Sequence, residues 1–175
     1  MIFEATPLQG VFVVKAERLE DERGFFSRLY CENEFRQVGI NFKPSQVSIS
    51  FNVEAQTLRG LHWQQGPSAE TKLVRPTSGA IFDVAVDVSP SSPTHRKWFA
   101  CELKSADMTA LLIPKGFAHG FLTLTPQVNV EYLMDAAYVP TSAQGARFDD
   151  PAFGISWPAQ PKVISKKDLS WNVYR

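Results

Sequence analysis

Acid–base chemistry is the chemistry that the histidines of this chain could perform. His62 and His119 each lie in a strand-like apolar segment, whereas His95 lies in SPSSPTHRKW, where a solvated loop position is expected. Histidine changes its charge near neutral pH, so it can take up and release protons under ordinary conditions. Taken alone, a strand histidine is also consistent with a hydrogen-bonded core or surface residue.

The segment around His62 holds more polar groups than a buried strand needs. TLRGLHWQ (57–64) also carries Arg59, and Lys72 follows in ETKLVR. Because buried polar groups are costly unless paired, such a cluster indicates a site. In an unbroken strand Arg59 and His62 point to opposite faces. Gly60 lies between them, and we predict a bulge or other irregularity there that brings both into one pocket.

Two further segments present polar groups on apolar strand faces. In LLIPKGFAHGFLTL, His119 shares a face with Phe117 and Phe121, so it is expected inside, either neutral and hydrogen-bonded or bound to an anionic group. In NVEYLMDA, Tyr132 shares its face with two valines. It is either a core tyrosine with a satisfied hydroxyl or a phenol that donates a proton to a carbanion.

The aspartates are less informative from their local sequence. Asp83 and Asp87 in IFDVAVDV share a face with apolar residues, and a buried aspartate there needs a cation such as Lys72. Asp168, in SKKDLSW, has no evident local partner and resembles a surface loop residue.

The elements that must position these residues are short strands. Apolar residues alternate with polar ones in segments broken by Gly, Pro and Ser, which is typical of an antiparallel sandwich or barrel. One brief helix, ENEFRQVG (32–39), is expected to end at Gly39. The segment 139–175 is rich in turn residues but contains large aromatics, so we expect it to pack over the sheets. Strands are expected in GVFVVKA, GFFSRLY, SQVSISFN, TLRGLHWQ, TKLVRPT, AIFDVAVDV, KWFACEL, TALLIPKG, HGFLTLT and NVEYLMDA.

Length and charge limit the class of protein. A chain of 175 residues fits one domain, 1–175, with a sizeable core. The 18 basic residues equal the 18 acidic ones, so nucleic acid and membrane are not indicated as partners. Cys31 and Cys101 form no redox, zinc or disulfide motif, and no signal sequence or spanning segment is evident. These features predict a soluble cytoplasmic protein.

Several of these segments together resemble one known family. The motifs GFF, SISFNVEAQTLRGLHWQ, KLVR, FDVAVDV, IPKGFAHGFL, EYL, DDPAFGISWP and SKKD occur in the order found in nucleotide-sugar 3,5-epimerases of the deoxythymidine diphosphate 4-dehydrorhamnose type. The resemblance covers nearly the whole chain. It implies an all-β, cupin-like jelly roll with one or a few short peripheral helices, a homodimer, and catalysis without a metal or an organic cofactor.

The resemblance also implies an activity. The family removes and returns protons on carbons beside the C4 ketone of a nucleoside diphosphate 4-keto-6-deoxyhexose, in deoxysugar and surface polysaccharide synthesis. The resulting enolate requires a base, an acid on the opposite face and a cation for the oxygen.

The resemblance assigns these roles residue by residue. His62 is the expected base, oriented by Asp168, and Tyr132 the acid. Lys72, with Asp83 nearby, is expected to stabilise the enolate oxygen. The residues expected to bind substrate are Arg59 and His119 along the sugar and diphosphate, Arg23 and Phe26 reaching the nucleotide of the neighbouring subunit, Gln46 near the nucleotide base or phosphates, and Arg28 at the nucleotide end.

Departures from the family pattern lie at the nucleotide end. Family members commonly have a glutamate at position 28 and an asparagine at position 48, where this chain has Arg28 and Ser48. They often carry a glutamate just before the Arg-Gly of the tail, where this chain reads Ala143, Gln144 and Gly145. A guanidinium offers only donors where a carboxylate offers only acceptors, so Arg28 alters what the nucleotide meets. A cytidine diphosphate sugar, or epimerisation at a single carbon, therefore stays open.

Two other classes compete with an epimerase. One is a jelly-roll module that binds a sugar nucleotide or glycan without turnover. The other is a metal-dependent cupin oxygenase, which would show H-x-H followed by a carboxylate and a later histidine. Position 64, two after His62, is glutamine, and the remaining histidines with Glu70 make a poor metal set.

Overall fold

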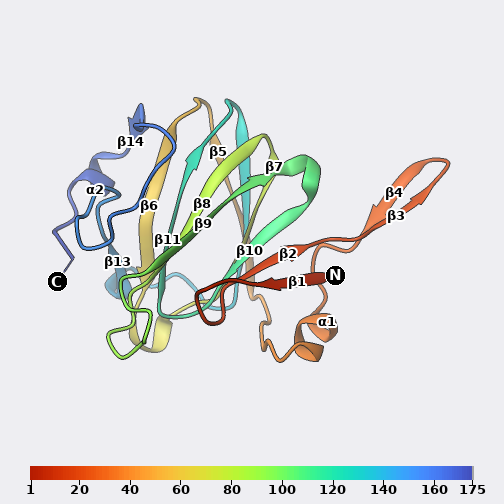
Figure 1. Cartoon of the computed structure of the whole chain (residues 1–175), viewed down its shortest axis with the longest axis horizontal. Helices are drawn as coiled ribbons and strands as arrows, with labels where there is room; N and C mark the ends of the chain where they lie inside the picture. The colour runs from red at the N-terminus through yellow and green to blue at the C-terminus, as the bar shows by residue number, and fades with distance from the viewer. Residues whose placement is uncertain (175) are drawn as a thin grey trace.

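The computed structural model describes residues 1–174, and its strands form two facing sheets (Figure 1). The first sheet has the order β1-β2-β10-β7-β12-β5, and the second has the order β13-β6-β11-β8-β9, with β14 parallel to β6. The all-β jelly-roll prediction is thus confirmed. The first sheet consists of β1 (Ile2–Ala5), β2 (Phe12–Lys15), β10 (Thr109–Ile113), β7 (Lys72–Ser78), β12 (Val128–Met134) and β5 (Gln46–Asn52). The second consists of β13 (Ala143–Gly145), β6 (Thr57–Gln64), β11 (Phe117–Thr123), β8 (Ala80–Asp87), β9 (Trp98–Lys104) and β14 (Val163–Ile164).

The core lies between the sheets because both contribute apolar side chains to one cluster. Val74, Leu111 and Val130 of the first sheet pack in the same cluster as Ile81 and Phe121 of the second. Alternation in each strand directs these residues inward. The space between the sheets is therefore the place where an inward polar residue must find a partner or a ligand.

The outer faces of both sheets are covered by different parts of the chain. The helix α1 (Glu32–Gln37) places buried Phe35 against the outer face of the first sheet. Gly39 after this helix has a φ of 79°, the left-handed geometry expected for it. Phe153 of the C-terminal segment packs with Leu61 and Val84 on the outer face of the second sheet.

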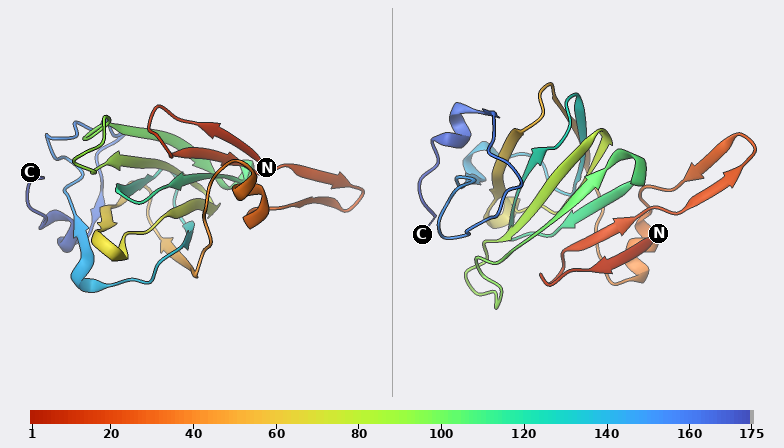
Figure 2. Two further views of the ribbon diagram at one scale, coloured as in Figure 1. Left: turned by 90° about the horizontal axis from the view of Figure 1, so that it is seen from below. Right: turned by 45° about the horizontal axis from the view of Figure 1, so that its top comes forward.

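A two-stranded hairpin projects away from the sheets. It consists of β3 (Arg18–Asp21) and β4 (Gly24–Ser27), and both views in Figure 2 show it extending from the body. Its strand β3 was not expected, and the predicted strand 24–30 ends at Ser27. Strand β1 and the tail strands β13 and β14 were also missed, because they are short and lack a clear alternation.

The remaining elements are short helices. They are η1 (Gly66–Ser68), η2 (Ser105–Asp107), η3 (Pro140–Ser142) and α2 (Lys166–Leu169). Within residues 1–174, no helix has the length and apolar character needed to cross a membrane. Both cysteines carry free thiols, in agreement with the prediction.

Candidate active site

The strand β6 is irregular at Gly60, as predicted. His119 pairs with His62 and Phe121 with Arg59, so the register of β11 against β6 shifts between them. The Gly60–Leu61 peptide bond is cis. A Cβ on Gly60 would lie 2.5 Å from Cα of Gly120, so the two backbones approach too closely for a side chain there. Arg59 and His62, on either side of this irregularity, both line one cavity.

This cavity has a volume of about 620 Å³ and lies between the two sheets. Its polar lining comes from inward positions of both sheets and from the tail. These side chains include Gln46, Ser48 and Ser50 of β5, Arg59, His62 and Gln64 of β6, Lys72 of β7, His119 of β11, Tyr132 of β12, and Asp168 of α2.

His62 forms a hydrogen-bonded pair with Asp168. Its Nε2 lies 2.6 Å from Oδ1 of Asp168, which is 4% exposed, while the His62 side chain is 42% exposed. The Ser165 hydroxyl caps α2 by accepting the Asp168 N–H at 3.0 Å. Burial acts to raise the pKa of Asp168, but hydrogen bonds from His62, the Gly60 N–H and Ser165 outweigh it, and the pKa is lowered. The pair leaves Nδ1 of His62 as the ring nitrogen that can accept a proton.

His119 pairs with Asp83 beside the first pair. Its Nε2 lies 2.6 Å from Oδ1 of Asp83, and both side chains are buried. Burial raises the pKa of Asp83, and the nearby His119 and Lys72 oppose that shift. Lys72, named from the sequence as an example of the cation that a buried aspartate needs, is not the hydrogen-bonded partner of Asp83; His119 takes that place. Asp87 accepts hydrogen bonds from the loop that follows it, and within residues 1–174 it forms no ion pair.

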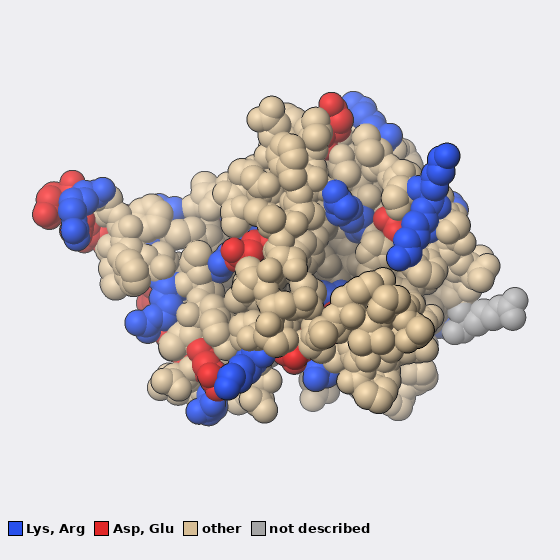
Figure 3. All heavy atoms as spheres, turned by 180° about the vertical axis from the view of Figure 1, so that it is seen from behind, with Lys and Arg blue, Asp and Glu red and all other residues tan. Residues whose placement is uncertain are grey.

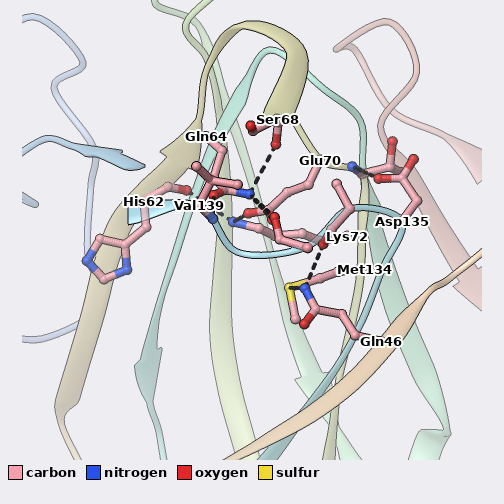
Figure 4. Close-up of polar contacts among 12 residues, drawn as sticks. Gln46, His62, Gln64, Ser68, Glu70, Lys72, Met134, Asp135 and Val139 are labelled. Atoms are coloured by element: carbon pink, nitrogen blue, oxygen red, sulfur yellow. Dashed lines mark hydrogen bonds and ion pairs between the residues drawn. The ribbon is translucent and has the colours of Figure 1, made fainter. Parts of the chain in front are cut away.

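Lys72 is buried near the backbone of His62. Its Nζ lies 3.0 Å from Oε1 of Glu70 and 3.3 Å from the carbonyl oxygen of His62 (Figure 4). An ammonium in this position is a charged donor beside the cavity. It can stabilise negative charge that develops on a bound ligand.

Tyr132 lies at the boundary between core and cavity. Its ring packs against the core cluster and lies 6.0 Å from the His119 ring in an edge-to-face arrangement. Its hydroxyl lies 3.5 Å from Oγ of Ser50. Burial raises the pKa of this phenol, which therefore keeps its proton well above neutral pH. Both readings from the sequence, core residue and proton donor, are compatible with this placement.

Arg59 and Gln46 are anchored at the wall of the cavity. Arg59 donates from Nε to Oδ1 of Asn52 at 2.7 Å and from Nη2 to the Phe51 carbonyl at 3.2 Å. Gln46 donates to the Ala136 carbonyl at 2.6 Å. Both face the cavity with defined orientations.

Three predicted binding residues lie outside this cavity. Arg23 and Phe26 are on the projecting hairpin, where Arg23 pairs with Asp21 and Phe26 is 66% exposed. Charged side chains gather at the hairpin tip, on the left in Figure 3. Arg28 pairs with Glu34 at 2.9 Å. The single chain does not bring these three to the other site residues.

Sequence reasoning missed several residues that contribute to the site. Ser50 contacts Tyr132, Glu70 contacts Lys72, and Tyr138 and Trp171 line the cavity. The signal for Ser50 was its inward parity in SQVSISFN. Glu70 was considered only as a metal ligand, and among residues 1–174 no group of three His, Cys, Asp or Glu side chains is placed to hold a metal.

The fold and the site together define a class of protein. A jelly roll whose inter-sheet cavity holds a His–Asp pair, a protonated phenol and an ammonium has the parts of an enzyme that moves protons on carbon next to a carbonyl group.

Comparisons with known proteins give the family. The family model described as dTDP-4-dehydrorhamnose 3,5-epimerase matches residues 5–175. The chain is 40% identical to the dTDP-4-dehydrorhamnose 3,5-epimerase of Sinorhizobium fredii over 171 residues, covering 97% of this chain and 88% of that protein. It is 30% identical to the dTDP-4-dehydrorhamnose 3-epimerase of Streptomyces niveus, over 92% of this chain and 78% of that protein.

A solved structure agrees with this result. The crystal structure of the Bacillus anthracis dTDP-4-dehydrorhamnose 3,5-epimerase with TDP and PPi bound superposes with a TM-score of 0.95. The two chains are 35% identical, and 99% of each is covered. The chain belongs to the dTDP-4-dehydrorhamnose 3,5-epimerase family and is a sugar epimerase.

Proposed function

We propose that this enzyme acts in the cytoplasm on a dTDP-linked 4-keto-6-deoxyhexose and epimerises it at C3 and C5. We also propose that it uses no metal or organic cofactor. The observation that carries the proposal is the convergence of His62, Asp168, Lys72 and Tyr132 on one cavity. The B. anthracis relative was solved with TDP bound, which supports the choice of nucleotide.

The proposed reaction begins with proton abstraction by His62. A proton on carbon next to the C4 ketone is acidic because the charge left behind spreads onto the ketone oxygen. Nδ1 of His62 accepts this proton, and Asp168 stabilises the imidazolium that forms. The ammonium of Lys72 stabilises the enolate oxygen.

The second half of the reaction requires a proton from another direction. His62 lies on β6 and Tyr132 on β12, and these strands belong to the opposite sheets that enclose the cavity. A sugar between the sheets therefore has the imidazole on one side and the phenol on the other. Delivery of the phenolic proton to the face opposite His62 inverts the carbon. Before the next turnover, the imidazolium of His62 loses its proton to solvent and the phenolate regains one from solvent.

We propose further that the nucleotide site is completed by a second copy of the chain. The edge strand β5 exposes a row of apolar side chains, Val47, Ile49 and Phe51, each more than half exposed. Such a row on a sheet edge favours association. The hairpin that carries Arg23 and Phe26 projects from the body of the molecule (Figure 1). In a homodimer it can therefore reach the partner's cavity.

Two observations support a second candidate for the nucleotide and for the number of carbons epimerised. Ser48 lines the cavity where family members commonly have asparagine, and Arg28 is paired with Glu34. A cytidine diphosphate sugar is thus a second candidate substrate. The S. niveus relative is a 3-epimerase, so exchange at one carbon is a second candidate outcome.

Proton exchange with solvent tests the proposal. The enzyme is incubated in deuterium oxide with dTDP- and CDP-linked 4-keto-6-deoxyhexoses, and deuterium at C3 and C5 is counted by NMR. Incorporation at both carbons of the dTDP sugar is expected, and incorporation at one defines a single-site epimerase. Tight nucleotide binding without deuterium incorporation would instead identify a non-catalytic binding module. Analytical sedimentation separately tests whether the protein is a dimer in solution.

A further inference from the structure

Glu70 is a buried carboxylate with both oxygens engaged. Its side chain is 8% exposed, Oε1 lies 3.0 Å from Nζ of Lys72, and Oε2 lies 2.8 Å from Nε2 of Gln64 (Figure 4). The same carboxylate therefore contacts a cation on one side and an amide on the other. The buried carboxylate of Glu70 and the ammonium of Lys72 need each other, because removing one would leave the other charge buried and unpaired, which is strongly destabilising.

Gln64 fixes the other side of this carboxylate. The residue is 4% exposed, and its Oε1 accepts the Val139 N–H at 2.6 Å. Its Nε2 also lies 3.0 Å from the Ser68 carbonyl oxygen and 3.1 Å from the Ala137 carbonyl oxygen. With Oε1 committed to an N–H and Nε2 facing only acceptors, the amide has a single favourable orientation. Glu70 consequently meets a fixed donor.

These contacts limit where the ammonium of Lys72 can lie. Besides Glu70, its one hydrogen-bond acceptor among the described residues is the carbonyl of His62 at 3.3 Å. The Lys72 ammonium is thus held between the carbonyl of His62 and the carboxylate of Glu70. Gln64 in turn holds that carboxylate in place. Gln64 also bonds the residues on both sides of Tyr138, which lines the same cavity.

We infer that Glu70, held by Gln64, is a positioning residue that fixes the ammonium of Lys72 at the place where enolate charge develops. The inference rests on the proposed function, because it assigns Lys72 the enolate oxygen. Glu70 itself need not touch the substrate. Its effect is on the distance between the ammonium and that oxygen, and small displacements of a positioned group lower turnover strongly.

The variant Glu70→Gln tests this role with a nearly isosteric change. An amide at position 70 must turn its NH2 toward either Nε2 of Gln64 or Nζ of Lys72, and each of these is a donor. One of the two contacts is therefore lost. We expect kcat for deuterium incorporation to fall about 10- to 100-fold, less than the largest losses on removing an oxyanion donor outright. KM and the dissociation constant of dTDP should stay within about twofold, since nucleotide contacts are untouched.

A second variant and a control separate positioning from folding. Glu70→Ala leaves a space beside Lys72 that formate can enter, so added formate should restore part of kcat while formamide should not. Glu102→Gln is the control, because Glu102 is exposed on β9 and, among the described residues, its one ion-pair partner is Lys104 at 3.7 Å. Thermal unfolding of each variant reports its folded fraction.

The outcomes distinguish this inference from the proposed function. Absence of exchange by the wild-type enzyme with every 4-keto sugar nucleotide would overturn both. Exchange by the wild type with an unchanged kcat for folded Glu70→Gln would overturn the positioning role alone. Equal recovery of kcat in Glu70→Ala with formate and with formamide would also overturn the positioning role. The negative charge beside Lys72 would then have no effect on turnover.

Discussion

Replacing Asp168 by asparagine changes one charge in the site and almost no volume. The carboxylate accepts from Nε2 of His62 at 2.6 Å and faces the backbone N–H of Gly60 at 3.4 Å. Both neighbours are donors to an acceptor-only group. An amide at this position must direct its NH2 at one of them.

Either orientation of the amide impairs His62 in its proposed role as the base. If its NH2 faces Nε2, the ring proton moves to Nδ1 of His62, the nitrogen that should take the substrate proton. If its NH2 faces the Gly60 N–H, that donor loses its acceptor, which costs about 1–3 kcal/mol. In both cases the imidazolium formed during proton abstraction loses an ionised acceptor, which is worth a further ~1.5–3 kcal/mol. At about 1.4 kcal/mol for each tenfold change, the loss at the imidazolium alone slows exchange about 10- to 10²-fold. The wrong tautomer of His62 slows it further, so we expect a total loss of about 10²- to 10⁴-fold.

The assay for Asp168→Asn is deuterium incorporation followed by NMR, with dTDP affinity measured by calorimetry. The affinity for dTDP should stay near that of the wild type, because Asp168 contacts His62 at the reacting end of the cavity and not the nucleotide. Asp107→Asn, at an exposed position in η2, is the matched control. A folded Asp168→Asn enzyme that exchanges within about tenfold of the wild type would refute the base assignment, since loss of the ionised acceptor and of the correct His62 tautomer together should slow exchange at least about 10²-fold.

The remaining predictions address the base, the acid, the strand contact and acid stability. His62→Ala should abolish exchange in deuterium oxide while calorimetry still detects dTDP binding, and retained exchange would remove His62 from its role. Tyr132→Phe should slow net epimerisation more than exchange at the first carbon, as followed by NMR; equal losses would count against the phenol as acid. Gly120→Ala should lower the free energy of unfolding by about 1–3 kcal/mol, because its Cβ would lie 2.9 Å from the carbonyl oxygen of Arg59; an unchanged urea midpoint would contradict this. The pKa of Asp168 in the folded protein is below its ordinary value, which is the value in the unfolded chain. Ionised Asp168 therefore stabilises the folded protein fully at pH values above the ordinary pKa, and this stabilisation is lost as the pH falls through the lower, folded pKa. The acid limb of stability against pH should therefore be shallower in Asp168→Asn, and identical acid limbs would refute the linkage.

The sequence predicted those parts of the site that depend on strand alternation. His119 lies inward with its two phenylalanines, and Gly60 interrupts β6 as expected, because period-two geometry and the glycine backbone are local properties. The partner of His62 is 106 residues away, and no local pattern could connect it to Asp168. That connection came from the resemblance instead.

Other features depend on tertiary packing. The strand β13 forms because Ala143–Gly145 lies along β6, although its sequence has little strand propensity. The pairing of Asp83 with His119 depends on which inward positions of β8 and β11 become neighbours. The sequence contains both residues, but the register that joins them is set by the assembled sheet.

Strand β5 presents two unrelated surfaces within seven residues. Gln46, Ser48 and Ser50 face the cavity, while Val47, Ile49 and Phe51 face outward. Point substitutions at the even-numbered positions of β5 can therefore change ligand selectivity without altering the outer surface. Substitutions at the odd-numbered positions can change the outer surface without altering the cavity. An insertion or deletion of one residue would exchange the two sets, so this strand can diversify by substitution but not by a change in length.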